Sequence, residues 1–153
     1  MNAYRRRVQY YETDRMGIAH HANYIRWMEE ARIDFMDQLG FPYAAMEAQG
    51  IVSPVRAVGC KYLRPCTFGD EIWIDVALEG FNGVVLSLRY TMRKQEESIC
   101  TASSEHVFLD REGRFVRMKQ AAPDFCRALE ALLAAQADAD ATGKSAGETE
   151  TGR

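Results

Sequence analysis

The stretch YIRWMEEARIDFMDQLGFP, residues 24–42, decides the fold of this chain. Its apolar residues recur every three or four positions, at Tyr24, Trp27, Met28, Ala31, Phe35 and Leu39. That spacing places side chains on one face of a helix, and such a face is stable only when another element covers it. The stretch therefore predicts one long helix that packs against a larger structure.

Both ends of this helix carry sequence signals. Asn23 or His21 is suited to begin it, and Gly40 followed by Pro42 supplies a C-terminal glycine and a stop. The charged side chains of the helix are expected to point outward, namely Glu29, Glu30 and Arg32.

From residue 52 onward the hydrophobic pattern changes to period two, which is typical of strands with one buried face. Asn82-Gly83 is a pair favoured in tight hairpin turns. Pro54 cannot donate to a strand ladder, so it suits a strand start, an edge or a bulge. With the segment that precedes the helix, the candidate strands are 4–11, 52–64, 72–79, 84–92, 98–109 and 114–118. Pro123 is suited to begin a short final helix.

This order of elements predicts an α+β fold, in which an antiparallel sheet packs one face over the long helix. The opposite face of the sheet also needs a cover. Apolar side chains such as Trp73 alternate along the strands there, and they favour oligomerisation.

Composition limits the possible functions. The chain has 153 residues, 47% of them hydrophobic, and a formal net charge of −3, which favours a single domain without a field for general nucleic-acid binding. No apolar run reaches the roughly 18–20 residues of a membrane span, and the first residues, MNAYRRRVQYYETD, contain no apolar segment of signal-peptide type. We therefore expect a cytoplasmic protein without a membrane span and without a nucleic-acid partner.

The last residues differ in composition from the rest. Residues 137–153, ADADATGKSAGETETGR, contain no large apolar side chain, so they bury too little surface to offset their ordering entropy. We predict a domain at residues 1–136 and a disordered tail at 137–153.

Neither the cysteines nor the histidines show the spacing of a metal site. Cys60, Cys66, Cys100 and Cys126 include no CxxC pair, and His20 and His21 form neither HxH nor HxxxH. The cysteines are expected to be reduced structural thiols, and no metal is expected. His106, on a strand, is expected to be structural.

The densest polar cluster is YYETDRMGIAHHANY, residues 10–24, between the first strand and the long helix. Two carboxylates, two histidines and a glycine at a strand-to-helix turn are typical of an active site. The free N–H groups of the helix N-terminus can polarise an acyl carbonyl. A nearby carboxylate can then attack that carbonyl or activate water.

The cluster also resembles a known signature. Its pattern Tyr10-x-Glu12-Thr13-Asp14-x-x-Gly17-Ile18, followed by Asn23-Tyr24, Trp27 and Glu30-Ala31-Arg32, is similar to that of hotdog-fold acyl-CoA thioesterases of the 4-hydroxybenzoyl-CoA thioesterase type. Pro65-x-x-x-Gly69-Asp70-Glu71 resembles the same family. The resemblance covers roughly residues 4–135. Many members carry Asp where this chain has Glu12.

The resemblance implies a fold, an assembly and a mechanism. Asp14 would be the catalytic carboxylate, as nucleophile or general base, and the backbone amide of His21 would polarise the thioester carbonyl. The sheet would wrap the helix, and two protomers would join edge to edge with the site at their interface, as a homodimer or homotetramer. Coenzyme A would be part of the substrate, with no separate cofactor.

Other residues are predicted around this site. Gly17, Tyr24, Ser53, Pro54 and Tyr62 are candidates for substrate binding. Cations on or beside strands are candidates for the coenzyme A phosphates, above all Lys61 and Arg64, with Arg56, Arg89, Arg93 and Lys94 as further members of the group. Plainer interpretations are a turn-forming Asp14, a solvated strand-end Glu12 and solvated cations.

The sequence therefore predicts hydrolysis of an acyl-CoA to a free acid and coenzyme A. Two alternatives remain open. A dehydratase or hydratase of the same fold would need the imidazole of His21 for proton transfer, and a binding module would hold acyl-CoA without releasing thiol.

Overall fold

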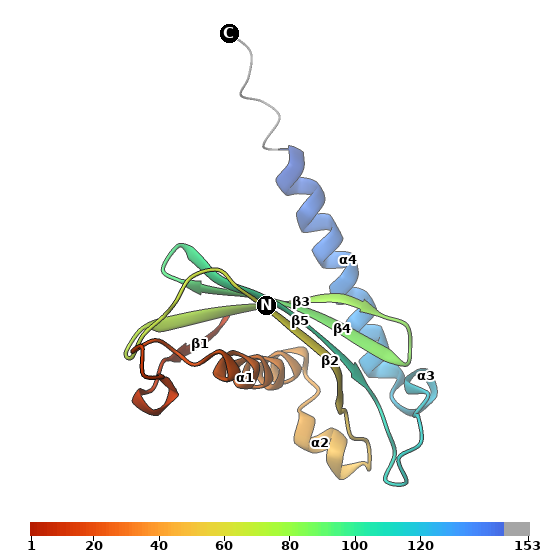
Figure 1. Ribbon diagram of the computed structural model, residues 1–153. Coiled ribbons are helices and arrows are strands. Elements are labelled where there is room, and N and C mark those ends of the chain that lie inside the picture. The colour runs from red at the N-terminus through yellow and green to blue at the C-terminus, as the bar shows by residue number, and fades with distance from the viewer. Residues whose placement is uncertain (146–153) are drawn as a thin grey trace.

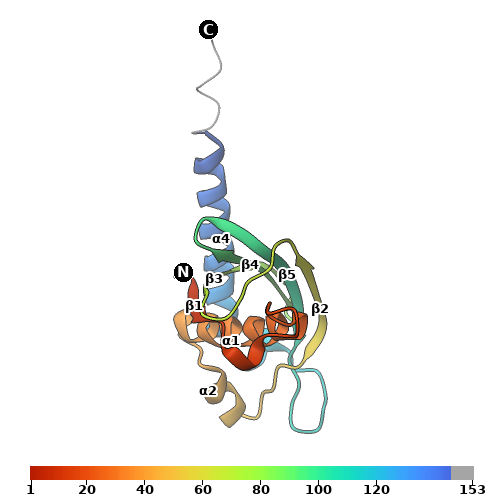
Figure 2. The same cartoon turned by 60° about the vertical axis from the view of Figure 1, so that its left-hand side comes forward.

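One curved antiparallel sheet surrounds a long helix in the computed structural model of the chain, which describes residues 1–145 (Figures 1 and 2). The strand order is β1-β3-β4-β5-β2, and every neighbouring pair is antiparallel. The strands are β1 (Tyr4–Arg7), β2 (Val55–Tyr62), β3 (Glu71–Phe81), β4 (Val85–Lys94) and β5 (Glu97–Val107). This confirms the predicted α+β fold with a sheet wrapped around one helix.

Helix α1 (His21–Leu39) is the helix predicted from the opening stretch. His20 caps it, because Nδ1 of its side chain accepts a hydrogen bond from the backbone N–H of Ala22. Gly40 ends it with a φ of 90°, a left-handed conformation that glycine adopts without a Cβ clash.

The apolar stripe of α1 and the inner face of the sheet form the core. Trp27 and Phe35 are at most 1% exposed, and they share one cluster with Ile74 and Leu88 of the sheet. Each such side chain contributes roughly 1.5–3 kcal/mol on burial. The period-two pattern of β3 and β4 therefore reflects one face on this core.

Arg32 differs from the prediction. It was expected to point outward, yet it is only 6% exposed. Arg32 follows Met28 by four residues and Tyr24 by eight, so all three lie on the same side of α1. We expected an outward position because the side chain is charged, but its spacing along the helix places it against the sheet.

The short elements also depart from the prediction. The first strand ends at Arg7, and a 3₁₀ turn, η1 (Tyr10–Glu12), follows it. Helix α2 (Tyr43–Ala48) lies in a segment for which no helix or strand was predicted. The strand predicted at 114–118 is wrong, because only an isolated bridge joins Phe115 to Leu109 before helix α3 (Met118–Ala121) begins.

Helix α4 (Pro123–Ser145) closes one end of the core and then projects from the sheet (Figure 1). Phe125 packs edge-on against Phe81 and Phe108. Residues 137–145 continue this helix, so the disordered tail predicted from residue 137 is wrong for them; residues 146–153 lie outside the described part of the chain. The domain boundary at residue 136 stays a prediction.

The two edges of the sheet differ in length. β1 has four residues, whereas β2 has eight, seven of them exposed.

In residues 1–145 no helix is both long and apolar enough to cross a membrane. The cytoplasmic location stays a prediction.

Candidate active site

A tight turn between η1 and α1 displays Asp14. Its backbone N–H donates to the carbonyl of Ile18 at 2.9 Å, and its carbonyl accepts from the N–H of Gly17 at 3.0 Å. Gly17 has a φ of 80°, a conformation that favours glycine. These bonds fix the turn immediately before the helix N-terminus.

The second motif of the sequence holds this turn from the other side. The carbonyl of Cys66 accepts from the N–H of Ala19 at 2.8 Å, and the hydroxyl of Thr67 donates to the carbonyl of Gly17 at 2.7 Å. The two motifs, about fifty residues apart in the chain, therefore form one structural unit.

Asp14 opens onto a pocket of about 380 Å³. The pocket lies between the turn, the start of α1 and the end of β2, and its walls include His21, Tyr24, Tyr62 and Arg64. Four predicted site residues thus gather around Asp14.

The carboxylate of Asp14 combines a structural bond with a free oxygen. Oδ1 accepts a hydrogen bond from the backbone N–H of Met16 at 2.8 Å, which is the turn-forming role of an Asp. Oδ2 has no hydrogen-bond partner among residues 1–145. The turn-forming interpretation is therefore correct, and it leaves one oxygen available at the half-buried position.

The helix N-terminus beside this carboxylate offers a donor. The N–H groups of Ala22 and Asn23 are bonded to His20, whereas the N–H of His21 has no partner in the described part of the chain. The carbonyl of His21 accepts from the hydroxyl of Tyr62 at 2.8 Å. The free N–H at a positive helix end is suited to stabilise an oxyanion.

Two tyrosines of the pocket remain neutral. Burial, and then a hydrogen bond with Cys66 at 3.2 Å, raise the pKa of Tyr24 far above its usual value. Burial raises the pKa of Tyr62 to about 12. Neither hydroxyl is suited to act as a base near neutral pH.

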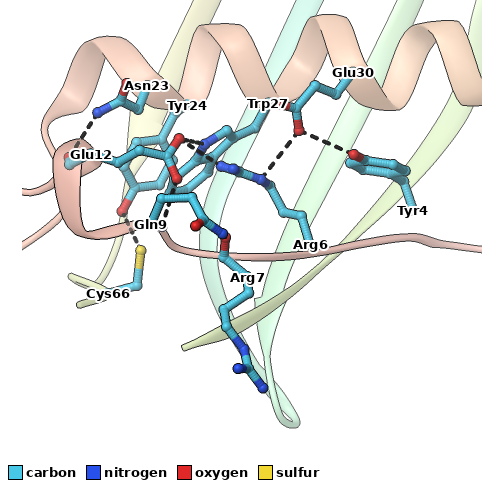
Figure 3. A network of polar contacts seen from close by, with 10 residues as sticks. All are labelled: Tyr4, Arg6, Arg7, Gln9, Glu12, Asn23, Tyr24, Trp27, Glu30 and Cys66. Carbon is cyan, nitrogen blue, oxygen red and sulfur yellow. Dashed lines mark hydrogen bonds and ion pairs between the residues drawn. The ribbon is translucent and has the colours of Figure 1, made fainter. Parts of the chain in front are cut away.

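Glu12 is buried in a polar network rather than solvated (Figure 3). It is 4% exposed, and its Oε2 accepts from Arg6 at 2.8 Å and from the indole N–H of Trp27 at 2.6 Å. Oε1 accepts from the backbone N–H of Gln9 at 2.8 Å. The strand-end interpretation of Glu12 is therefore wrong, because its partners lie six and fifteen residues away in sequence.

The main chain of Glu12 joins the same network to the helix start. Its carbonyl accepts from the N–H of His20 at 2.8 Å. The same carbonyl accepts from the side-chain amide of Asn23 at 2.7 Å (Figure 3). Arg6 also pairs with Glu30 at 3.2 Å and lies over the ring of Trp27. Glu12 thus fixes the positions of both ends of the Asp14 turn without touching the pocket.

Four predicted residues do not line this pocket in the single chain, and one of them, Gly17, lies in the Asp14 turn. Ser53 and Pro54 precede β2, at the end opposite to Tyr62. Lys61 lies in a separate shallow hollow with Arg89. Their contact with a substrate stays a prediction.

Most of the cations proposed for phosphate binding are already paired with carboxylates. Arg64 pairs with Glu97 at 2.7 Å, and Lys94 pairs with Asp70 at 2.9 Å. The same holds for Arg56, Arg89 and Arg93. In the described residues Lys61 alone of the six forms no ion pair.

The histidines and cysteines show no metal-binding geometry. The rings of His20 and His21 stack on each other at 4.1 Å. Across residues 1–145 no group of three or more His, Cys, Asp or Glu side chains is placed to hold a metal ion. All four cysteines are free.

The chain is similar to several known proteins. The family described as Thioesterase-like superfamily matches residues 8–135. YneP of Bacillus subtilis, whose name gives acyl-CoA thioesterase as a provisional activity, is 35% identical over 80% of this chain and 91% of its own length. An Aquifex aeolicus protein provisionally called an esterase is 35% identical over 74% of this chain and 88% of its own.

A solved structure is also similar. The DHNA-CoA thioesterase of Staphylococcus aureus superposes with a TM-score of 0.86 at 28% identity, and the match covers 90% of this chain and 94% of that one.

Proposed function

The chain belongs to the Thioesterase-like superfamily and has the hotdog fold, and we propose that it hydrolyses acyl-CoA thioesters to a free carboxylic acid and coenzyme A. Asp14 supplies the carboxylate, and the backbone amide of His21 stabilises the oxyanion. The acyl-CoA class of substrate is supported by the names of the relatives. A 4-hydroxybenzoyl-CoA type of activity is one member of that class.

One observation carries this proposal: Asp14 and His21 line the same pocket. Among residues 1–145, Oδ2 of Asp14 and the backbone N–H of His21 have no hydrogen-bond partner. An acyl carbonyl placed between them would have a hydrogen-bond donor for the negative charge that develops on its oxygen, and a base or nucleophile near its carbon. One such N–H donor is worth about 3–4 kcal/mol in the transition state.

Two routes are compatible with the site. In the first, Asp14 takes a proton from water, the hydroxide adds to the carbonyl carbon, and the C–S bond breaks as the thiolate of coenzyme A leaves and takes up a proton. In the second, Asp14 adds directly to the carbonyl, the same thiolate leaves, and water hydrolyses the resulting anhydride. Both routes consume one water and yield an acid and a thiol.

The exposed edge of β2 supports a homodimer. The strand is long and flanked by exposed apolar side chains, including Val58 (43% exposed) and Leu63 (45% exposed). Such an edge is usually covered in a stable protein. We propose edge-to-edge pairing of two β2 strands; a monomer at micromolar concentration in sedimentation velocity would contradict it.

Release of thiol from acyl-CoA esters tests the function. A panel with short, long and aromatic acyl groups is incubated with the protein and a thiol reagent, and the acid product is identified by mass spectrometry. We expect catalytic thiol release from at least one ester. Saturable binding without thiol release would favour a binding module, and hydration of an enoyl ester that is lost in His21→Ala would favour a hydratase.

A further inference from the structure

A second cavity lies farther along the seam between α1 and β2. Its volume is about 100 Å³, and exposed apolar side chains, Ile25, Val55 and Val58, flank it. Its walls also include Arg32, Ser104 and His106. The apolar entrance thus leads to buried polar groups that the proposed reaction does not use.

Arg32 is a largely buried side chain whose cation has no carboxylate partner in the described part of the chain. In residues 1–145 it forms no ion pair and no hydrogen bond, and its one recorded contact is with the ring of Tyr43, 5.3 Å from the guanidinium. Glu29 borders the same cavity but is not within ion-pair distance. Buried charges in proteins are normally paired, since removing a charge from water is costly.

Neighbouring polar atoms are also without partners. His106 is 1% exposed; its Nε2 bonds to the hydroxyl of Ser104 at 2.7 Å, and that hydroxyl bonds to Tyr90 at 2.9 Å. Nδ1 of His106 and Oγ of the buried Ser53 have no hydrogen-bond partner in the described chain. Burial, and then the charge of Arg32, lower the pKa of His106 to about 3, so the imidazole is neutral. Among the residues that line the cavity, Arg32 carries the positive charge and Glu29 is the one carboxylate.

We propose that this cavity binds a negatively charged oxygen group, such as a carboxylate, at the far end of the acyl group of the substrate. The guanidinium of Arg32 would pair with the anion, because its planar donors match a carboxylate. A cavity of about 100 Å³ admits a few heavy atoms and not the nucleotide of coenzyme A. The proposal rests on the proposed function and names its substrate class.

The proposed dimer brings this cavity near the Asp14 pocket. Along α1, His21 and Arg32 are eleven residues apart, about 16 Å of helix. If two β2 strands pair antiparallel, the Val55 end of one strand lies beside the Tyr62 end of the other. The acyl group in one pocket would then extend toward the Arg32 cavity of the second protomer.

Matched pairs of CoA esters test the proposal. Each pair has the same acyl length, from four to ten carbons, and ends in a carboxylate or in a methyl group. We expect wild type to favour the carboxylate ester at least tenfold in kcat/KM at one or more lengths. Arg32→Met should lower kcat/KM for that ester at least tenfold and for the methyl ester less than threefold.

Arg26→Met is the matched control. Arg26 is exposed on the same helix, so its loss should leave both esters within twofold. A wild type that does not distinguish the paired esters, or an Arg32→Met variant that loses activity on both equally, would overturn the proposal. If Arg32→Met does not fold, Ile25→Trp narrows the entrance instead and should lower turnover of the carboxylate ester selectively.

A binding measurement separates this proposal from the proposed function. If no ester releases thiol, the thioesterase proposal fails, and titration calorimetry with glutarate then decides the site. Binding to wild type that Arg32→Met abolishes would support the anion site alone. Absence of glutarate binding would overturn the anion site. If wild type does release thiol but does not distinguish the paired esters, binding of glutarate would assign the cavity to a free carboxylate rather than to the acyl group.

Discussion

Two buried arginines occupy opposite situations in this molecule. Arg6 lies over the ring of Trp27 at 4.7 Å and pairs with Glu12 and Glu30. Arg32 lies over the ring of Tyr43 and, in residues 1–145, pairs with no carboxylate. Arg6 pairs with two carboxylates of the chain, whereas Arg32 has no carboxylate partner among residues 1–145.

The difference separates structural from binding roles. The Arg6 network joins β1, the Asp14 turn and α1, so its charges stabilise the position of the turn (Figure 3). Arg32 fixes no other element by an ion pair, and its cavity opens beside the edge strand. Variants in the Arg6 network and variants at the Arg32 cavity should therefore affect different measurements.

The largest expected effect on stability comes from removing the partner of Arg6. Glu12→Ala removes one of the two carboxylates that pair with Arg6 and leaves the indole N–H of Trp27 without its acceptor, so we expect the free energy of unfolding to fall by about 3–5 kcal/mol. Urea unfolding followed by circular dichroism measures it. Glu47→Ala, at an exposed position of α2, should change it by less than about 0.5 kcal/mol; equal effects would remove the structural role of Glu12.

The next largest expected effect is a pH dependence of the free energy of unfolding, which comes from His106 at the Arg32 cavity. The pKa of His106 is about 3 in the folded protein and roughly 6.5 in an unfolded chain. The unfolded state therefore takes up a proton first as pH falls below 6.5, and stability present at pH 7 is lost toward pH 3. By pH 5 this loss amounts to about 2 kcal/mol.

His106→Gln tests this dependence. Urea unfolding at pH 7 and pH 5 should show a smaller difference in the variant, by about 2 kcal/mol. An unchanged pH dependence in His106→Gln would mean that His106 is not buried neutral.

The smallest expected effect is on the stability of Arg32→Met. Replacing an unpaired buried cation by an apolar chain of similar length should change the free energy of unfolding by less than about 1 kcal/mol, or raise it. Arg6→Met should instead cost at least about 3 kcal/mol, because two carboxylates lose their partner. Similar losses of unfolding free energy in the two variants would contradict the difference between Arg6 and Arg32.

The fold could be predicted from periodicity because its main elements are long and amphipathic. The stripe of α1 and the alternation in β3 and β4 depend on burial of one face, which spacing reveals. Helix α2 was missed because it has six residues and buries only Met46. The alanines of residues 137–145 favour helix by propensity, a signal that the absence of large apolar residues obscured.

The site could be predicted only in part. One pocket brings together five of the predicted residues, namely Asp14, His21, Tyr24, Tyr62 and Arg64. The first three belong to the local motif, and the last two come from the end of a predicted strand. The burial of Glu12 depends on Arg6 and Trp27, which no short spacing links to it. Arg32 could have been placed from the four-residue interval after Met28, had spacing been given more weight than charge.

The most direct test of the account is the turnover number of Asp14→Asn with an acyl-CoA that wild type hydrolyses well. We expect kcat to fall roughly a hundredfold or more, the lower range for loss of a general base, with a thermal midpoint close to that of wild type. Asp37→Asn, exposed on α1, should retain full turnover. An Asp14→Asn variant that releases thiol at a rate close to wild type would contradict the assignment of Asp14 as the catalytic carboxylate.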